Sequence, residues 1–151
     1  MNIRPADLCD VPAMTRIVSG AYQKYTERIS KPPGPVLDDY GLRVRSHAVW
    51  VAEIDGTVAG LIVLLPKEDH LLLENVAVDP SCQGLGVGRA LLRFAEKEAD
   101  RRGYAELRLY TNEKMTENLA MYPALGWEET HRGEQDGCRR VFFRKRLRGP
   151  L

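Results

Sequence analysis

The sequence predicts an α/β (α+β) fold, with a mixed and mostly antiparallel sheet of about seven strands flanked by about four helices. Three observations lead to this prediction. Residues 71–78 are apolar and end at an Asp-Pro pair, which is typical of a central strand buried on both faces. Three glycines within 84–88 follow, and apolar side chains then recur at helical steps up to residue 102. Finally, an Asp-Gly pair at 55–56 separates two apolar runs, as in a β-hairpin.

The amino-terminal elements follow from apolar periodicity and from residues that break regular structure. A short alternation over 2–4 predicts the first strand, and helical spacing over 7–25 predicts the first helix. Residues 30–35 contain too much proline for a helix or a central strand, so we expect a loop there. A second short helix is expected over 36–45.

The remaining elements complete the sheet. Residues 47–54 and 57–65 are the two strands of the hairpin. Residues 104–111 alternate in polarity and predict a strand parallel to the central one, because a helix separates the two in sequence. The last elements are a helix over 115–125, capped by Asn112 or Thr116 and closed by Gly126, and strands over 127–130 and 139–147 around a turn at 133–137.

Length and composition restrict the class of protein. A chain of 151 residues suits one domain, which we place over 1–151. The hydrophobic share of 44% and charged share of 28% are ordinary for a globular protein. No apolar run reaches the ~20 residues of a membrane span, and the first residues lack the apolar core of a secretion signal. We therefore expect a cytoplasmic protein without a membrane partner.

Charge and metal-ligand patterns exclude other classes. The net charge of +1 gives no general attraction for nucleic acid. A basic cluster near the carboxyl terminus is interpreted as the solvated face of a final strand rather than a nucleic-acid patch. The three cysteines and three histidines are scattered, so we predict no disulfide framework and no metal site. The cluster comprises Arg139, Arg140, Arg144, Lys145, Arg146 and Arg148.

The glycine-rich segment 83–88 has the chemistry of an anion site. The first N–H groups of a helix have no partner inside it and lie at the positive end of the helix dipole. A loop without side chains lets a phosphate approach them closely. A dinucleotide fingerprint needs a third glycine where Arg89 stands, and the Gly-Lys-Ser/Thr of a nucleotide-triphosphate loop is absent.

Two motifs resemble those of the GNAT superfamily of N-acetyltransferases. Gln83-x-x-Gly-x-Gly after a strand is similar to the motif that binds the pyrophosphate of acetyl-CoA in that superfamily. Asn118-x-Ala-x-Tyr122, followed by Gly126-Trp127, is similar to its second signature. Together the motifs and strand order cover nearly the whole chain. Met115 stands where the common signature has an Asn seven residues before the tyrosine, so Asn118 is the candidate to replace that Asn.

The resemblance implies a fold in which two parallel strands splay apart and acetyl-CoA lies between them as a cosubstrate. Val76 and Val78 would offer backbone groups to the pantetheine arm. The other residues implied in cofactor binding are Gln83, Gly84, Gly86, Gly88, Arg89 and Asn118.

Catalysis needs a group that protonates the departing thiolate and one that deprotonates the amine. Tyr122 is the candidate acid, because a phenol stays protonated at neutral pH. The alternative is an ordinary core tyrosine. Glu74 lies in an otherwise apolar strand and is the candidate base, because burial raises the pKa of a carboxyl group. The alternative for Glu74 is a structural ion pair with Arg108.

The expected product is an acetylated primary amine, formed by direct attack in a ternary complex. Acidic residues near the proline-rich segment suit a cationic acceptor and Arg28 suits a carboxylate, which favours a small amine or amino-acid-like molecule. Peptide or protein amines, and a non-catalytic acyl-CoA-binding module, stay open as alternatives. Phe142 and Phe143 on the terminal strand suggest a homodimer. The candidate acceptor residues are Tyr25, Arg28, Asp38, Asp39, Tyr40, Arg108 and Tyr110.

Overall fold

The computed structural model describes residues 1–25, 34–135 and 137–147. It contains one seven-stranded sheet, as expected, and its described helices of six or more residues are α1, α3, α4 and α5. In chain order the elements are β1 (Asn2–Pro5), α1 (Val11–Tyr22), α2 (Gly34–Leu37), α3 (Tyr40–Arg45), β2 (Val49–Ile54), β3 (Thr57–Pro66), β4 (Leu71–Val78), α4 (Val87–Arg101), β5 (Glu106–Asn112), α5 (Thr116–Ala124), β6 (Glu128–Gln135) and β7 (Cys138–Arg146).

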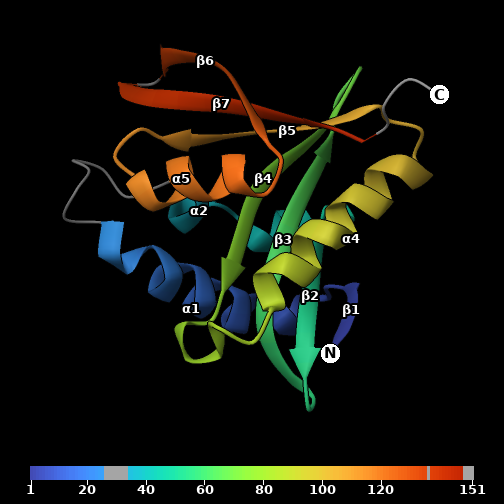
Figure 1. Ribbon diagram of the computed structural model, residues 1–151. Helices are drawn as coiled ribbons and strands as arrows, with labels where there is room; N and C mark the ends of the chain where they lie inside the picture. Colours follow the sequence, from blue (N-terminus) through green and yellow to red (C-terminus); the bar gives the residue numbers. More distant parts are fainter. Residues whose placement is uncertain (26–33, 136, 148–151) are drawn as a thin grey trace.

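The strands follow the order β1-β2-β3-β4-β5-β7-β6, and every neighbouring pair is antiparallel except β4 and β5. That parallel pair is short, because only Leu71 opposite Leu107 and Leu72 opposite Arg108 are in register. Beyond these residues the two strands diverge (Figure 1). The expected parallel pairing and the expected splay are both confirmed.

A β-bulge in β4 changes which side chains are buried. Val63 of β3 lies opposite Asn75 and Leu64 lies opposite Leu73, so Glu74 between them has no opposite residue. The alternation of faces therefore shifts by one residue at Glu74. The expectation of a strand buried on both faces is wrong, because every second side chain of β4 is only half-buried.

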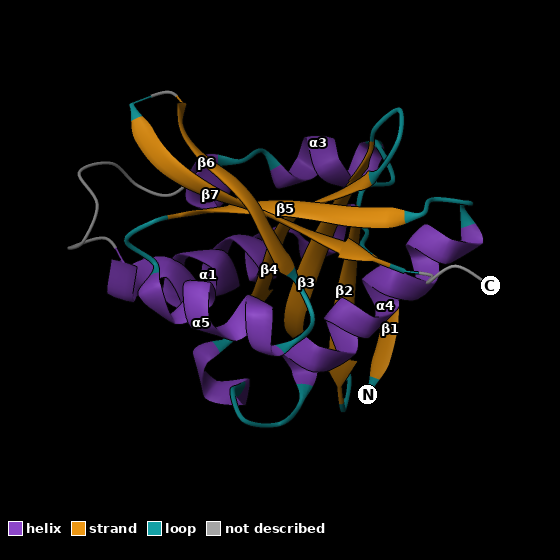
Figure 2. Cartoon of the chain, turned by 45° about the horizontal axis from the view of Figure 1, so that its top comes forward, coloured by secondary structure: helices purple, strands orange, loops and turns teal. Residues whose placement is uncertain are grey.

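Helices cover both faces of the sheet and make two apolar cores (Figure 2). The apolar stripe of α4, which includes Leu91 and Ala95, packs with Leu71 and Leu73 of β4. On the other face, Ile17 of α1 packs in a second core that includes Ala77. The bulge thus lets one strand contribute buried side chains to both cores, Leu71 and Leu73 to the first and Ala77 to the second.

Several element boundaries differ from those expected. Residues 34–35 belong to α2 rather than to a loop, and residues 30–33 lie outside the described part of the chain. The expected helix over 36–45 is two helices, because the Asp39 carboxylate accepts from the Leu42 N–H and begins α3 anew. Strand β6 continues to Gln135, since Gly133 pairs with β7, so the expected turn at 133–137 is too long.

The expected side-chain cap of α5 is also wrong. Met115 occupies the N-cap position and makes no side-chain cap. The Asn112 side chain instead accepts from the Lys114 N–H at 2.9 Å. The Thr116 hydroxyl donates to Glu117, so neither candidate residue caps the helix. Gly126, with a φ of 93°, follows the helix end as expected.

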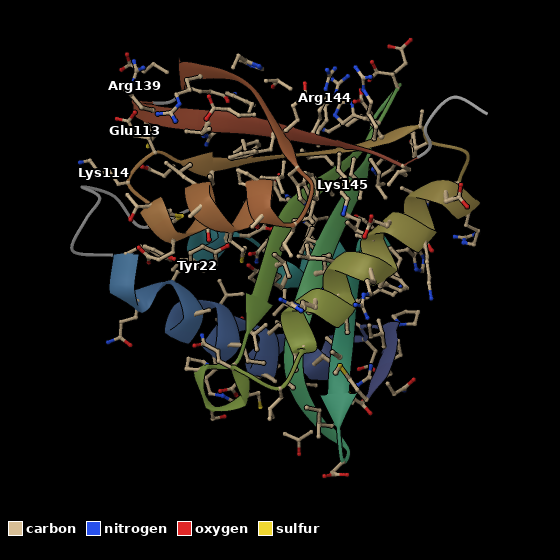
Figure 3. All side chains as sticks on the ribbon, in the orientation of Figure 1. Tyr22, Glu113, Lys114, Arg139, Arg144 and Lys145 are labelled. Atoms are coloured by element: carbon tan, nitrogen blue, oxygen red, sulfur yellow. The ribbon has the colours of Figure 1, made fainter. Side chains whose placement is uncertain are left out.

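The carboxyl-terminal basic cluster consists largely of paired side chains. Arg139 pairs with Glu113 at 3.3 Å, and Arg144 pairs with Glu128 at 3.0 Å (Figure 3). Lys145 pairs with a carboxylate of α4 at 3.1 Å. These contacts support a solvated ion-paired strand.

Strand β7 does not offer the pairing edge that a homodimer through Phe142 and Phe143 would use. It lies between β5 and β6, and Phe143 is buried with 2% of its surface exposed. A homodimer remains a prediction without that support. No helix in the described part of the chain is long and apolar enough to cross a membrane.

Candidate active site

A cleft of about 600 Å³ opens where β4 and β5 part. Its walls come from the second half of β4, the loop that follows, the start of α4, the inner face of α5 and the end of α1. Every residue that the sequence implied in cofactor binding lines this one cleft, together with the candidate acid. They are Val76, Val78, Gln83, Gly84, Gly86, Gly88, Arg89, Asn118 and Tyr122.

The loop between β4 and α4 is shaped by local hydrogen bonds and by two glycines. The Asp79 carboxylate accepts from the Ser81 N–H at 2.9 Å, which starts a 3₁₀ turn. Gly84 and Gly86 have φ angles of 85° and 82°, a backbone conformation that disfavours side chains. Gly86 is the N-cap of α4, a helix of 15 residues.

This loop fits a phosphate group. The first N–H groups of α4 have no partner inside the helix and lie at its positive end. A Cβ atom at Gly84 or Gly86 would meet nothing within 4 Å, so the space in front of the backbone is open. Arg89 lines the cleft and is exposed, which adds a cation at the same place.

The β5-facing edge of β4 supplies the second part of the cleft. Strand β5 pairs with β4 only at Leu71 and Leu72, while Val76 and Val78 lie further along and line the cleft. An extended molecule with amide groups can pair with such an edge as another strand would. The edge and the glycine loop are continuous, which fits a long ligand with a phosphate at one end.

Tyr122 packs in the core and also lines the cleft, so its position fits both alternatives from the sequence, a core tyrosine and a catalytic acid. Its ring packs against Trp127 and Phe143, with centroid distances of 5.7 Å to each. The residue is 5% exposed and also lines the cleft. Burial raises the pKa of Tyr122 to about 12, so the phenol keeps its proton throughout the neutral range. A buried, protonated hydroxyl beside the cleft suits a proton donor.

Asn118 and Met115 occupy different environments on α5 and at its start. Asn118 lines the cleft, and its Nδ2 donates to the Thr111 hydroxyl at 3.2 Å. Met115 is buried, and its sulfur accepts from the same hydroxyl at 3.3 Å. The methionine therefore belongs to the core, while Asn118 faces the cleft.

Glu74 lies at the bulge, where β4 turns from one core to the other. The Tyr110 hydroxyl donates to its carboxylate oxygens at 3.3 and 3.4 Å, across the gap between the diverging strands. Burial raises the pKa of the Glu74 carboxyl group. Glu74 is not among the residues that line the cleft, and its carboxylate contacts β5 through Tyr110 instead.

The alternative ion pair between Glu74 and Arg108 is wrong. Arg108 lies opposite Leu72 at the start of β5, which keeps it away from the bulge. Its guanidinium pairs with Glu106 at 2.6 Å and with Asp69 at 3.5 Å. Tyr110 is the partner of Glu74 instead.

The other candidate acceptor residues have varied placements. Tyr25 is buried and lines the cleft, whereas Arg28 lies outside the described residues. Asp38 pairs with Arg43, and Asp39 caps α3. The Tyr40 side chain is buried at 3% exposure in the second core, so the expectation that it contacts an acceptor at the surface is wrong. Arg108 and Tyr110 lie on β5 outside the cleft lining.

Sequence reasoning missed a buried polar network behind the cleft wall. Tyr22 lines the cleft at the end of α1, where Figure 3 labels it, and its hydroxyl donates to Asn75 Oδ1 at 2.7 Å. Asn75 Nδ2 donates to the Tyr40 hydroxyl at 3.1 Å, and that hydroxyl donates to the Pro35 carbonyl. A lone asparagine within an apolar strand was the one available signal.

Sequence comparison identifies the class of protein that this fold and cleft define. The family model for the acetyltransferase (GNAT) family matches residues 12–127. The chain therefore belongs to the acetyltransferase (GNAT) family.

Two curated relatives resemble part of the chain. N-acetyltransferase family 8 member 3 of Rattus norvegicus is 34% identical over 87 residues, which are 54% of this chain and 38% of that protein. The ribosomal protein bS18-alanine N-acetyltransferase of Escherichia coli (strain K12) is 36% identical over 75 residues, which are 50% and 51% of the two chains. The chain thus matches about two fifths to one half of the length of these relatives.

Solved structures share the fold over nearly the whole chain. The ribosomal-protein-S18-alanine N-acetyltransferase of Escherichia coli superposes with a TM-score of 0.77 at 23% identity, covering 99% of this chain and 96% of that one. YncA of Salmonella typhimurium, solved with its cofactor acetyl-CoA, has a TM-score of 0.72 at 23% identity, covering 100% and 96%. At these identities the likeness shows the fold alone.

Within the described residues, no group of three His, Cys, Asp or Glu side chains is arranged to hold a metal ion.

Proposed function

We propose that this protein is an acetyl-CoA-dependent N-acetyltransferase of one domain, which transfers the acetyl group to a primary amine by direct attack in a ternary complex. One observation carries the proposal: the glycine loop, the open edge of β4 and the Tyr122 side chain line a single cleft. The acetyl-CoA in the YncA structure, which has the same fold, supports the choice of donor.

The donor is held mainly by backbone groups. The N–H groups at the start of α4 bind the phosphates, with Gln83 and Arg89 beside them. Val76 and Val78 pair with the pantetheine arm through their backbone, and Asn118 contacts that arm from α5. When bound, acetyl-CoA supplies an activated acyl group with a thiolate as the leaving group.

The two proton transfers are divided between the two sides of the splay. Glu74 removes a proton from the ammonium of the acceptor, directly or through water, because its raised pKa makes the carboxylate a better base. The amine nitrogen then forms a bond to the acyl carbon as the carbon–sulfur bond breaks, and the nitrogen releases its second proton to solvent. Tyr122 donates its phenolic proton to the departing sulfur, and the proton is restored from solvent.

The acceptor is proposed to be a small molecule, because Asp38 and Arg43 place charges of both signs near Glu74. We call this region, with Tyr110, the acceptor side. A second candidate is the amine of a peptide or protein. A relative named as a ribosomal protein bS18-alanine N-acetyltransferase favours that candidate. A non-catalytic acyl-CoA-binding module is the alternative outside the enzyme class.

The experiment that tests the proposal is detection of free thiol from acetyl-CoA over a panel of amino acids, polyamines, aminoglycosides and peptides. We expect thiol release that depends on one class of amine and is lost in Tyr122→Phe. Tyr104→Phe is the matched control, because the Tyr104 hydroxyl donates to the Lys67 carbonyl on the surface. Binding of acetyl-CoA without any amine-dependent release would support the binding module and overturn the transferase.

A further inference from the structure

The acceptor side of the splay contains a cation that no carboxylate among the described residues neutralises. Arg140 of β7 lies on the same face of the sheet as Tyr110, because Tyr110 is in register with Phe142, two residues further on. The Arg140 guanidinium lies over the Tyr110 ring, 4.4 Å from its centroid. The hydroxyl of the same ring donates to Glu74. Tyr110 therefore links a cation and an anion.

The neighbouring charges of the chain are already paired. Arg139 and Arg144, on either side of Arg140 in β7, each have a carboxylate partner within 4 Å. On α3, Arg43 pairs with Asp38 at 2.9 Å. Arg140 instead donates to the neutral amide of Gln135 at 2.7 Å, and no carboxylate of the described residues lies within 4 Å of it. Of these cations, Arg140 has the charge left to bind an anion.

The position of Arg140 is fixed rather than free. Stacking on an aromatic ring and donation to an amide both orient the plane of a guanidinium. A guanidinium that is already oriented loses less conformational freedom when it binds a carboxylate through two parallel hydrogen bonds. Tyr110 brings Arg140 and Glu74 into one neighbourhood, because its ring lies under the guanidinium and its hydroxyl donates to the carboxylate.

We propose that Arg140 binds a carboxylate of the acceptor while Glu74 receives its ammonium, so that the preferred substrate is an amino-acid-like molecule. This inference rests on the proposed transferase function and names the class of acceptor. A polyamine or aminoglycoside has no anion to offer Arg140. An unmodified peptide amino terminus has its α-carboxylate converted into an amide, so it also lacks the group.

The test compares free amino acids with their carboxamides as acceptors in the thiol-release assay. We expect the amino acid to be the better substrate in the wild-type protein. Arg140→Gln is expected to raise the KM for the amino acid by about 10- to 100-fold, the range of a charge-assisted hydrogen bond, and to change the KM for the carboxamide by less than about 3-fold. Arg140→Lys is expected to restore part of the difference.

Arg139→Gln is the matched control, because it removes the same charge from the adjacent residue on the opposite face of β7. Equal use of amino acid and carboxamide by the wild-type protein would overturn the proposal while leaving the transferase intact. An equal effect of Arg140→Gln on both substrates, or an equal effect of Arg139→Gln, would also overturn it. If peptides with an acidic side chain were the preferred substrates, the carboxylate that Arg140 binds would belong to a protein acceptor. That result would contradict the small-molecule assignment.

A binding measurement separates this proposal from the function on which it rests. Side-chain NMR of the arginine Nε–H groups, with CoA present, is expected to show a shift of the Arg140 signal on addition of the amino acid and not of its carboxamide. A shift without any thiol release would support the anion site and contradict the transferase. Absence of both would overturn both.

Discussion

The two sides of the β4–β5 splay are built from different parts of the chain. The donor side uses backbone groups from one continuous stretch, the second half of β4 through the start of α4, with α5 above it. The acceptor side uses side chains from α3, β4, β5 and β7; Glu74 and Tyr110 are 36 residues apart in sequence, and Tyr110 and Arg140 are 30 apart. A site made of backbone is encoded locally, whereas a site made of side chains exists only after the sheet has formed.

The difference has a consequence for substitution. Changes at Glu74, Tyr110 or Arg140 leave the cleft lining untouched, because none of these residues belongs to it. Changes in the glycine loop leave the acceptor side untouched for the same reason. The Michaelis constant for acetyl-CoA and the Michaelis constant for the amine can therefore be altered separately by substitution.

The largest effect is expected for Tyr122→Phe, the candidate acid in the cleft lining. Loss of a general acid lowers kcat by about 100- to 1,000-fold, while the dissociation constant for acetyl-CoA changes little because the ring still packs on Trp127 and Phe143. Stopped-flow or steady-state thiol release and calorimetric binding measure the two quantities. With the pKa of Tyr122 at about 12, this residue is expected to cause no loss of activity between pH 7 and pH 10. Retention of kcat in the variant would remove Tyr122 from the mechanism.

Glu74→Gln is expected to lower kcat/KM for the amine by about 10- to 100-fold at neutral pH, without changing the KM for acetyl-CoA. In the wild-type protein kcat/KM falls as the pH drops through the raised pKa of Glu74, because only the carboxylate accepts a proton. The variant is expected to lose that acidic limb. A pH profile of the same shape in both proteins would assign the base elsewhere.

Glu74→Gln is also expected to change the free energy of unfolding, by an amount that depends on pH. A folded-state pKa above the unfolded value means that the folded protein holds the Glu74 proton more tightly. This contribution to stability is complete below the unfolded pKa and is lost as the pH rises through the folded pKa. At pH 7, Glu74→Gln is therefore expected to have a higher free energy of unfolding than the wild type. At about pH 4, this difference between the two proteins is expected to be smaller. Urea unfolding at the two pH values measures it.

Gly86→Ala tests the donor side alone. A Cβ atom at a φ of 82° strains the backbone by about 1 kcal/mol, and the N–H groups of the loop move away from the phosphate positions. The dissociation constant for acetyl-CoA is expected to rise about 10-fold, with the KM for the amine unchanged. Gly133→Ala is the control, because Gly133 lies in β6, where a Cβ would meet nothing within 4 Å and φ is not positive. Similar losses in both variants would point to a general effect of adding a methyl group.

The smallest effect is expected for Tyr40→Phe, behind the acceptor side. The change removes the acceptor of the Asn75 N–H, so a buried polar group loses its partner and the free energy of unfolding falls by about 1–2 kcal/mol. Tyr104→Phe removes a surface hydroxyl and is expected to change it by less than about 0.5 kcal/mol. Denaturant unfolding of the two variants gives the comparison, and equal stabilities would show that the network contributes little.

How much could be predicted from the sequence also differs between the donor side and the acceptor side. The order of strands and helices along the chain, the parallel pair and the glycine loop could be predicted, because apolar periodicity, the Asp55-Gly56 turn and the glycines are signals carried by residues close together in sequence. The bulge at Glu74 could not, because an almost continuous apolar run does not show where the alternation of faces shifts. The expectation of a strand buried on both faces failed because every second side chain of β4 is only half-buried, which an apolar run does not show.

Long-range side-chain contacts account for most of what sequence reasoning missed. The partner of Glu74 was sought at Arg108 and is Tyr110, because the register of two strands that separate after two pairs decides which side chain reaches the carboxylate. Arg140 was one of several basic residues in a cluster. Its contact with the Tyr110 ring and the pairing of Arg139 and Arg144 with Glu113 and Glu128 distinguish it.

The short contact between β4 and β5 also bears on how the protein survives purification and storage. Past Leu72, within the described residues, the β5-facing side of β4 is an unpaired strand edge in the middle of a sheet. Exposed strand edges recruit strands of other molecules and begin aggregates. A bound pantetheine arm would occupy that edge as a small substitute strand. We therefore expect preparations saturated with CoA to stay monodisperse in light scattering for longer than preparations from which CoA has been removed.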